Sequence, residues 1–406
     1  MSYLANLPTA NTRRIAVKIK PTAEKHLRQG HPWLFEQSIT KLSFEGKPGD
    51  VAIVFDKNDD FLAAGLYDPA SEIRVKILIH GESKVFDARW IHKQIQKAYQ
   101  IRIPLEKTTT TGYRLINGEN DAFPNLVVDR YGDVLVMKLY SPIWLPHLNS
   151  ILESLIKIVN PSAIVLRFAR RISEAETAGL QDGQVLYGDL PNPVVRFVEN
   201  GILFQADVVK GHKTGFFFDQ RDNRAKVRAL SRDRHVLDVF CYSGGFTVSA
   251  FVGGAKSVLS IDSSQAALDE IHQNLQLNWN DASAMDDVFQ PKKADAFAYL
   301  DQLLERNRQF DLVVIDPPSM ANQQGQTDSA LEQYRRLAML GSELTKRNGI
   351  LVMASCSSRV KADVFFATVS RSLNRPPVKI ETTGHALDHP ITFDEGEYLK
   401  CAFVFF

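Results

Sequence analysis

The chain contains few cysteines, almost no net charge and no long apolar run. Its three cysteines, Cys241, Cys356 and Cys401, are too few and too scattered for a disulfide framework, and no pair has the spacing of zinc ligands. We therefore predict no metal site and a reducing, cytoplasmic setting. No apolar stretch is long enough to cross a bilayer, and residues 1–12 lack the apolar core of a signal peptide. These absences argue against a membrane protein and against a disulfide-rich secreted domain.

Charge is balanced over the whole chain but not locally. Lys and Arg number 48 and Asp and Glu 47, so no overall field attracts nucleic acid, and any such binding must come from a local patch. The most basic stretch, Lys210 to Arg234, holds eight Lys and Arg against three Asp and Glu, together with aromatic residues. Such mixtures are typical of nucleic-acid-binding surfaces. The alternative is a solvated helix, Gln220–Leu230, with Lys226 and Arg228 in water.

The length predicts two or three domains, and the pattern divides the chain into three segments. Residues 14–83 predict a β-rich module with strands at Ile15–Ile19, Val51–Val54, Phe61–Tyr67 and Arg74–Ile79. Residues 84–204 predict a small α+β domain. Its expected elements are helices at Asp87–Arg102 and Ile151–Val159, a hairpin of Leu126–Val128 and Val134–Leu139 around residues 129–133, and a strand at Ala163–Phe168.

Residues 205–406 alternate strands and helices, which predicts a Rossmann-like α/β domain with a mostly parallel sheet covered on both faces. The expected strands are His235–Phe240, Ser257–Ile261, Asp311–Ile315, Gly349–Ala354 and Leu399–Phe405, with a helix at Gln265–Asn278. Such domains bind their ligands at the carboxyl edge of the sheet. The residues that follow the strands are therefore the candidate site residues.

The residues after the first two strands of this domain indicate a nucleoside cofactor. Ser243, Gly244 and Gly245 form a turn that lets a ligand approach the backbone, but the spacing is not Gly-x-Gly-x-x-Gly, which weakens a dinucleotide assignment. Asp262 ends the second strand, where an acid can accept hydrogen bonds from ribose hydroxyls. Alternatively it caps the next helix, a role that Ser263 could share. S-adenosylmethionine has no pyrophosphate and needs no full phosphate cradle.

A third acid should lie near the adenine of such a cofactor. Asp287 and Asp295 compete for this role. We prefer Asp295, because a helix at Tyr299–Glu305 is expected between it and the next strand. Either acid could instead belong to a surface turn.

The fourth strand ends with Asp316-Pro317-Pro318-Ser319. The prolines remove two backbone donors and stiffen the chain, which leaves carbonyl groups and the Asp316 carboxylate at the edge of the sheet. Enzymes that methylate exocyclic amino groups of DNA and RNA usually have an aromatic residue after the two prolines. Ser319 in its place favours chemistry at a ring carbon.

Cys356 has the chemistry that a ring carbon requires. It follows an apolar strand and lies between Ser355 and Ser357. C5 of cytosine is a poor nucleophile, but a thiolate that adds to C6 makes C5 enamine-like, and loss of the C5 proton then expels the thiolate. A free thiol has a pKa of about 8.5, so the site must favour the thiolate. The alternative is a buried structural cysteine, which we expect for Cys241 and Cys401.

These motifs occur together with others in a fixed order. The set is His31–Phe35, Gly65–Ser71, Gly118–Asp121, Val127–Gly132, Lys213–Phe217, Asp219–Arg221, Tyr242–Gly245, Asp316–Pro318, Ser355–Ser357 and Glu395–Lys400. Together they resemble the bacterial 23S rRNA cytosine-C5 methyltransferases over nearly the whole chain. The resemblance implies a PUA RNA-binding domain at 14–83, a linker helix and central domain at 84–204, and a class I methyltransferase domain at 205–406.

The resemblance also implies roles for individual residues. Cys356 would be the nucleophile, and Asp316 would hold the target base. The residues implied in binding S-adenosylmethionine are Thr214, Gly215, Phe217, Asp219, Arg221, Asp238, Ser243, Gly244, Gly245, Asp262 and Asp295. The implied partner is 23S rRNA or a large-subunit precursor, and a homodimer is possible. Many relatives carry a second cysteine after the proline of the fourth-strand motif, whereas this chain has Ser319 and Met320 there, so another base must accept the C5 proton.

Two other functions remain open. One is methylation at another rRNA position, with Cys356 as a structural residue. The other is a non-catalytic rRNA-binding assembly factor, which would not bind the cofactor. The glycine spacing disfavours an NAD-linked oxidoreductase.

Overall fold

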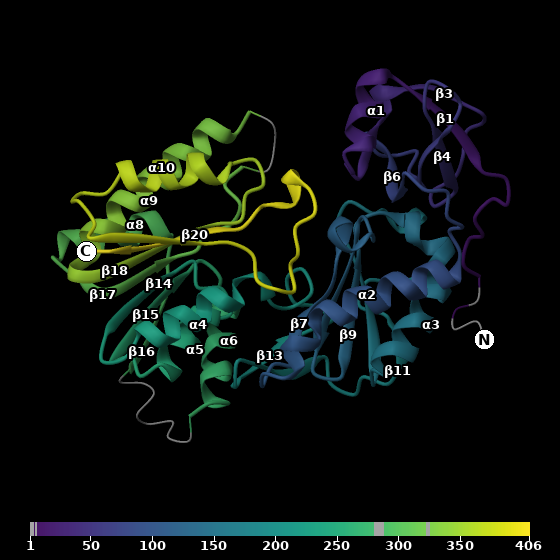
Figure 1. Cartoon of the computed structure of the whole chain (residues 1–406). Helices are drawn as coiled ribbons and strands as arrows, with labels where there is room; N and C mark the ends of the chain where they lie inside the picture. Colours follow the sequence, from purple (N-terminus) through teal and green to yellow (C-terminus); the bar gives the residue numbers. More distant parts are fainter. Residues whose placement is uncertain (1–3, 5, 280–287, 322–324) are drawn as a thin grey trace. The chain divides into compact units, whose positions relative to one another are not determined.

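The computed structural model of the chain describes residues 4, 6–279, 288–321 and 325–406 (Figure 1). Contacts between Cα atoms divide it into two compact units. The first unit comprises Met1–Val198, Gln205–Phe216 and Leu387–Asp394, and the second comprises Glu199–Phe204, Phe217–Ala386 and Glu395–Phe406. Our domain limits at 14–83, 84–204 and 205–406 stay predictions.

The first unit begins with a six-stranded sheet in the order β2-β6-β5-β4-β1-β3. Its elements are β1 (Ile15–Ile19), α1 (Pro21–Arg28), β2 (Trp33–Phe35), β3 (Ile39–Leu42), β4 (Val51–Phe55), β5 (Phe61–Tyr67) and β6 (Ile73–His80). The strands predicted from the sequence are present. We did not predict β2, β3 and α1, because the two strands are short and α1 has few apolar residues.

A second sheet in the same unit has the order β11-β10-β9-β8-β7. Its strands are β7 (Gly112–Asn117), β8 (Leu126–Tyr131), β9 (Val134–Leu139), β10 (Ala163–Phe168) and β11 (Val185–Gly188), with helices α2 (Ala88–Glu106) and α3 (Leu148–Val159). The hairpin is confirmed, but its turn is shorter than predicted, because β8 continues to Tyr131 and pairs with Val134. One core joins this sheet to the first, since Leu66 and Leu78 belong to the same buried cluster as Ile95 and Leu152.

Between these elements and the second unit the chain forms the hairpin of β12 (Val194–Glu199) and β13 (Ile202–Asp207). Residues 199–204 at its tip belong to the second unit. Within that unit Glu199 forms a buried ion pair with Arg224, with 2.6 Å between Oε2 and Nη2.

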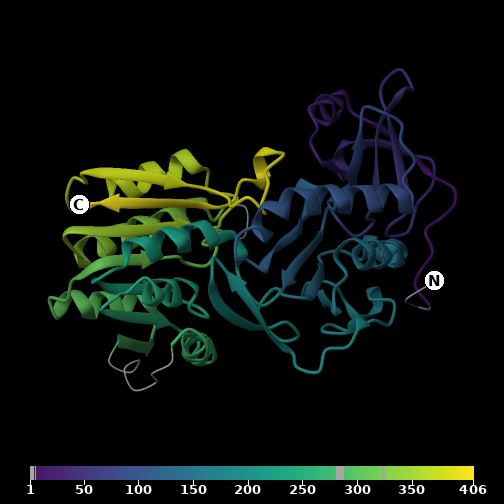
Figure 2. The ribbon, with the colours of Figure 1, turned by 60° about the horizontal axis from the view of Figure 1, so that its bottom comes forward.

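The second unit contains a seven-stranded sheet in the order β16-β15-β14-β17-β18-β20-β19. The strands are β14 (His235–Val239), β15 (Ser257–Asp262), β16 (Phe289–Lys293), β17 (Phe310–Ile315), β18 (Thr345–Ser355), β19 (Lys379–Thr383) and β20 (Lys400–Phe405). Strands β14 to β18 are parallel, whereas β20 runs antiparallel to β18 and β19 and forms with β19 the yellow pair in Figure 2. The predicted strands are present, and β16 and β19 were not predicted.

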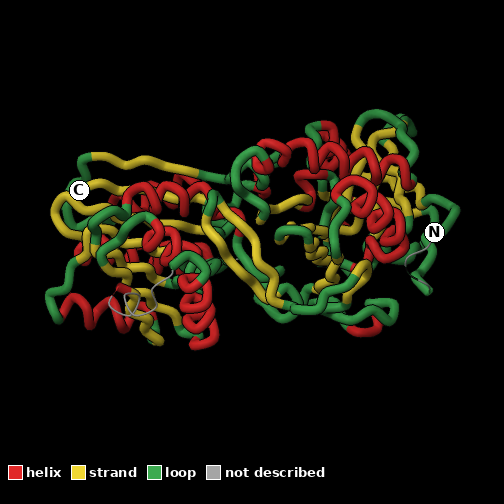
Figure 3. The backbone as a smooth tube through the Cα atoms, turned by 90° about the horizontal axis from the view of Figure 1, so that it is seen from below, coloured by secondary structure: helices red, strands yellow, loops and turns green. Residues whose placement is uncertain are grey.

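Helices cover both faces of this sheet, as predicted. They are α4 (Arg221–Leu230), α5 (Gly245–Val252), α6 (Gln265–Gln276), α8 (Ala296–Glu305), α9 (Thr327–Leu344) and α10 (Ala362–Arg371). Figure 1 shows α8, α9 and α10 on one face and α4, α5 and α6 on the other, and Figure 3 shows helices in red and strands in yellow. One buried cluster contains Leu300, Leu337 and Phe365, and another contains Val227 and Phe246. None of the helices in the described ranges combines the length and apolarity needed to span a membrane.

We predict that Arg102→Met strongly destabilises the first unit. Arg102 is fully buried on α2 and donates two hydrogen bonds to the Asp121 carboxylate, at 2.9 and 2.7 Å. Removal of one partner of a buried ion pair leaves an uncompensated charge and costs about 3–5 kcal/mol. Urea unfolding should show this loss. The exposed pair Lys157–Glu153 on α3 of the same unit provides the control, since Lys157→Met should cost about 0.5 kcal/mol or less. Equal losses in both variants would contradict the prediction.

Candidate functional site

The turn after β14 has an unusual backbone that only certain residues permit. Phe240, Tyr242 and Gly244 all have positive φ angles, of 62°, 47° and 82°. A Cβ atom on Gly244 would lie 2.7 Å from Cγ1 of Ile271, so a side chain is excluded there by space as well as by conformation. The turn leads into Gly245, the first residue of α5. The turn itself is held by hydrogen bonds that the N–H groups of Cys241 and Gly244 donate to the carbonyl groups of Ile261 and Cys241.

Two buried oxygen atoms beside this turn lack protein partners. In the described part of the chain, neither Ser243 Oγ nor Asp238 Oδ1 has a hydrogen-bond partner. The other Asp238 oxygen accepts a hydrogen bond of 2.6 Å from Thr247, whose hydroxyl also lies 2.7 Å from Ser260 Oγ. Buried polar atoms are nearly always paired, so two orphans at one turn indicate a polar ligand.

The environment of Asp238 disfavours its charged form. The residue is fully buried, and burial raises its pKa to about 7. The carboxylates of Asp316 and Asp262 act in the same direction, whereas the Thr247 hydroxyl opposes them. A cationic or hydrogen-bond-donating ligand would relieve this repulsion.

Asp262 fixes the glycine turn instead of capping a helix. Its carboxylate accepts hydrogen bonds from the backbone N–H of Tyr242, at 3.0 Å, and of Ser264, at 2.9 Å. The N-cap of α6 is Ser264, whose Oγ accepts from the N–H of Ala267. The alternative prediction, that Asp262 or Ser263 caps this helix, is therefore wrong.

Asp295 follows β16, on the far side of β15 from β14. It is the N-cap of α8, and its Oδ1 accepts a hydrogen bond of 3.0 Å from the N–H of Ala298. Its side chain is exposed, so its second oxygen can reach a ligand. The competing acid, Asp287, lies outside the described residues.

Asp316, directly after β17, is held by a chain of polar side chains. Gln220 Nε2 donates to Asp316 Oδ1 at 2.9 Å, and Gln220 Oε1 accepts from Asn223 at 2.6 Å. Asn223 in turn accepts from the Thr383 hydroxyl on β19. No local pattern in the sequence indicates these partners, because they come from distant parts of the chain.

The residues before α4 pack against the same edge. Phe217 makes an edge-to-face contact with Tyr242, with ring centroids 5.3 Å apart. Asp219 accepts a hydrogen bond of 3.0 Å from the Tyr398 hydroxyl. Arg221 is buried, and its Nε lies 3.2 Å from Asp222. These predicted residues therefore lie with the glycine turn and Asp316 in the second unit.

Thr214 and Gly215 belong to the first unit. Thr214 Oγ1 donates to the buried Asp129 carboxylate at 2.6 Å, and the backbone N–H of Phe216 donates to the Tyr131 hydroxyl at 2.9 Å. Gly215 has a φ angle of 128°, which glycine adopts without strain. Thr214 and Gly215 therefore lie beside β8 in the first unit, whereas the other residues predicted to bind the cofactor belong to the second unit.

Cys356 differs from the other cysteines in its surroundings. It is partly exposed after β18, whereas Cys241 and Cys401 are buried, as predicted. Burial raises the pKa of the Cys241 and Cys401 thiols, which favours the neutral form. β18 is the parallel neighbour of β17, so Cys356 and Asp316 follow adjacent strand ends.

A buried lysine, which we did not predict, supports the Cys356 loop. Lys400 on β20 is 1% exposed, and its ammonium group donates to the carbonyl groups of Ser357 and Val360, the latter at 2.8 Å. Burial lowers the pKa of Lys400 to about 8, while the Cys356 and Glu397 side chains raise it. Its presence in an otherwise apolar strand was the signal that could have revealed it.

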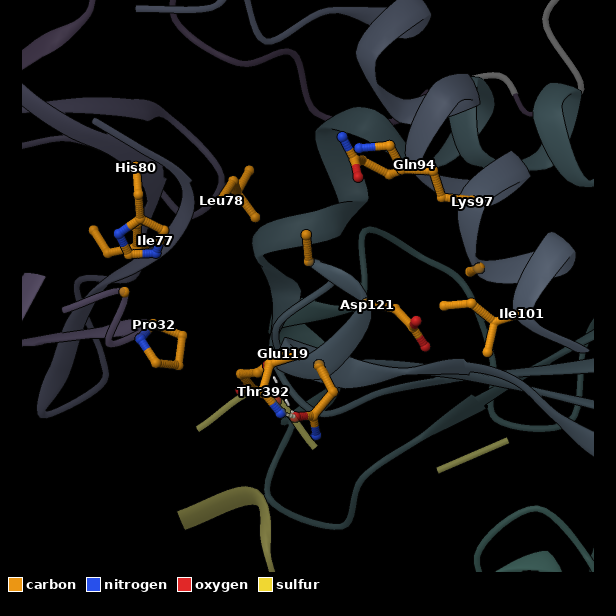
Figure 4. Close-up of a pocket in the computed structure, with 14 residues that line it drawn as sticks. Pro32, Ile77, Leu78, His80, Gln94, Lys97, Ile101, Glu119, Asp121 and Thr392 are labelled. Carbon is orange, nitrogen blue, oxygen red and sulfur yellow. Dashed lines mark hydrogen bonds between the residues drawn. The ribbon is translucent and has the colours of Figure 1, made fainter. Parts of the chain in front are cut away.

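The first unit has a separate hollow between β6 and α2 (Figure 4). Its volume is about 320 Å³, and its labelled lining includes Ile77, His80, Lys97, Glu119 and Asp121. Apolar, basic and acidic side chains all face it. Among the described residues, no three His, Cys, Asp or Glu side chains gather as metal ligands would.

Comparisons with known proteins agree with this architecture. Residues 125–380 match the family described as S-adenosylmethionine-dependent methyltransferase, and residues 17–79 match a PUA-like domain. A Deinococcus radiodurans protein named ribosomal RNA large subunit methyltransferase is 41% identical, over 98% of this chain and 98% of its own length. A Shewanella frigidimarina protein named ribosomal RNA large subunit methyltransferase I is 35% identical, over 95% of this chain and 98% of its own.

Two solved structures share the fold. A putative S-adenosylmethionine-dependent methyltransferase from Streptococcus mutans has a TM-score of 0.81 at 20% identity, covering 96% of this chain and 100% of that one. A putative methyltransferase crystallised with SAH has a TM-score of 0.82 at 21% identity, covering 97% of this chain and 100% of that one. Given the family match and these close relatives, the chain belongs to the S-adenosylmethionine-dependent methyltransferase family, with a PUA-like domain at residues 17–79.

Proposed function

We propose that this enzyme methylates C5 of a cytosine in 23S rRNA of the large ribosomal subunit, through a covalent adduct of Cys356 with C6. The names of its relatives support large-subunit rRNA as the substrate. The observation that carries the cytosine-C5 chemistry is the partly exposed Cys356, in a loop held by a buried lysine beside the strand that ends in Asp316.

The glycine turn fits S-adenosylmethionine. The unpaired oxygens of Asp238 and Ser243 suit a ligand that donates hydrogen bonds. The close packing of Gly244 against Ile271 fixes the turn that carries Ser243. Asp262 at the end of β15 would receive the ribose hydroxyls, and Asp295 after β16 would lie near the adenine. Phe217, Asp219 and Arg221 would close this site from the start of α4. When bound, the cofactor supplies an electrophilic methyl group.

In the proposed reaction Cys356 acts twice. Its Sγ would form a bond to C6 of the cytosine, which transfers electron density to C5, so that C5 would take the methyl group as the sulfonium–methyl bond breaks and S-adenosylhomocysteine leaves. After the methyl group is attached, a base takes the C5 proton, the C5–C6 double bond forms again and the thiolate leaves. Asp316, oriented by Gln220, would hold the base through its hydrogen-bonding edge.

Lys400 contributes by position and by charge. Its ammonium group fixes two carbonyl groups on the C-terminal side of Cys356, which limits the conformations open to the thiol. A positive charge near a thiol also favours the thiolate. Lys400 is therefore assigned as a positioning residue for the nucleophile.

The covalent step predicts a sharp loss of activity in Cys356→Ala. Methyl transfer to an unmodified 23S rRNA transcript should fall by at least about 1,000-fold, because the nucleophile is absent, while cofactor binding stays unchanged. Nucleoside mass spectrometry with labelled S-adenosylmethionine measures the product. Ser358→Ala, an exposed neighbour in the same loop, is the control and should retain 5-methylcytosine formation. Label in another nucleoside that survives in Cys356→Ala would overturn the proposal.

The role of Lys400 predicts a change in thiol reactivity. In Lys400→Met, alkylation of Cys356 by iodoacetamide at about pH 7.5 should slow about tenfold, because the thiolate loses a nearby cation. Lys379→Met removes an exposed cation from the adjoining strand β19 and should leave the rate unchanged. If Lys400→Met also alkylates at the wild-type rate, Lys400 does not influence the nucleophile.

The raised pKa of Asp238 predicts a pH-dependent stability without cofactor. The pKa of Asp238 is about 7 in the folded protein and about 4 in the unfolded chain, so the folded protein holds the proton more tightly. This difference stabilises the folded protein below about pH 4, and the stabilisation is lost as the pH rises through 7. Asp238→Asn should remove up to about 3 kcal/mol of this dependence, as measured by urea unfolding at about pH 5 and pH 8.

The same substitution tests the cofactor role. Calorimetry at about pH 8 should show S-adenosylmethionine bound about tenfold or more weakly by Asp238→Asn, because a charge-assisted hydrogen bond is lost. An unchanged affinity would remove Asp238 from the cofactor site, whatever its effect on stability.

A further inference from the structure

Five basic side chains gather on the first unit, and none of them belongs to the proposed catalytic or cofactor site. They are Lys138 on β9, Arg167 on β10, Arg170 just beyond it, and His212 and Lys213 in the segment after β13. β9 and β10 are parallel neighbours, and Lys138 pairs directly with Arg167 in the register. Like charges directly opposite each other destabilise a sheet. An anion bound at this position would offset the repulsion.

The backbone segment that carries His212 and Lys213 is fixed to these strands. Lys138 Nζ donates to the Lys213 carbonyl at 3.0 Å, and Arg167 Nη1 donates to the Gly211 carbonyl at 3.1 Å. Each of these hydrogen bonds holds one cationic side chain against the segment, and the segment itself carries the side chains of His212 and Lys213. Lys138 is 8% exposed, whereas Arg170, His212 and Lys213 are exposed. The cluster thus has a fixed base and accessible outer members.

Two carboxylates lie near these cations. Asp182 forms an ion pair with Arg167 at 3.1 Å and also accepts the Phe168 N–H. Asp207 accepts hydrogen bonds from the N–H groups of Val209 and Lys210, at 2.9 and 2.7 Å, and so stabilises the turn after β13.

The neighbouring cations add to the effect of burial on the pKa values of Lys138 and His212. The pKa of Lys138 is lowered to about 8, mainly by burial and then by Arg167, Lys213 and Arg170, against the opposing effect of Asp182. Burial also lowers the pKa of His212, followed by the effects of Lys213, Lys138, Arg170 and Arg167. An anion bound among these groups would oppose the effect of the neighbouring cations on both pKa values.

We propose that Lys138, Arg170, His212 and Lys213 form a binding site for a backbone phosphate of the RNA substrate. This inference rests on the proposed function, which supplies an RNA. A phosphodiester oxygen accepts from lysine, arginine and imidazole donors alike, and such hydrogen bonds position a nucleic acid without reading its sequence. The hollow in Figure 4 is a weaker candidate, because the carboxylates of Glu119 and Asp121 line it and would repel a polyanion.

The test uses the full-length protein and an unmodified 23S rRNA transcript. Filter binding over a range of KCl concentrations gives the affinity and its salt dependence for the wild type and for Arg170→Gln/Lys213→Gln. Arg89→Gln/Lys93→Gln removes the same charge from exposed positions of α2 in the same unit and is the matched control. Calorimetry with S-adenosylmethionine verifies that each variant is folded.

The expected result is an affinity about tenfold lower in the cluster variant at low salt. Its plot of log K against log [KCl] should be shallower by about 0.7 to 0.9 for each phosphate that the variant no longer neutralises, with the control like the wild type. Equal affinity and slope in the two variants would overturn the inference. The inference would also be overturned if the cluster variant bound RNA as tightly as the wild type but no longer bound inorganic phosphate. The cluster would then be a site for a free anion. Wild-type protein that fails to bind the transcript would instead contradict the proposed function.

Discussion

The parallel pairing of β14 to β18 is the constraint on which the rest of the second unit depends. A parallel sheet needs a crossover between successive strands, and the helices of these crossovers bury both faces. Polar side chains then have a place only where the strands end. Since parallel strands end at the same edge, the turn after β14, Asp262, Asp316 and Cys356 are brought to one edge although they are spread over more than a hundred residues.

Polar groups at that edge fix the loops in place. Asp262 ties the glycine turn to β15, Gln220 ties the start of α4 to Asp316, and Lys400 ties the Cys356 loop to β20. Each hydrogen bond joins a loop to a strand or to a second loop, and breaking those made by Gln220 and Lys400 would leave a buried donor without a partner. The oxygens of Asp238 and Ser243 at the glycine turn differ, because among the described residues they have no hydrogen-bond partner, and this difference is the reason for placing them in the proposed cofactor site.

The sequence predicted the buried central strands of the fold better than its edge strands. Strands such as Val236–Val239, Asp238 apart, and Leu351–Ala354 are apolar because both faces are buried, and apolar runs can be recognised without a structure. β16 was missed because its sequence, Phe-Gln-Pro-Lys-Lys, is polar and contains a proline, which an edge strand tolerates. The solvated interpretation of α4 was wrong for Lys226, which pairs with Glu381 and lies over the Phe403 ring at 4.1 Å. Gln220 could not be predicted, because a hydrogen-bond partner distant in the chain leaves no local pattern, whereas Lys400 left a signal that we missed, a lysine in an otherwise apolar strand.

The unequal burial of the three thiols has a practical consequence. Cys241 and Cys401 are buried and held in the neutral form, so a mild electrophile meets one accessible sulfur atom in the native protein, that of Cys356. The wild-type chain can thus carry a single fluorophore or spin label without any engineered cysteine. Such a label would report on the loop between β18 and α10 while the cofactor site is filled and emptied.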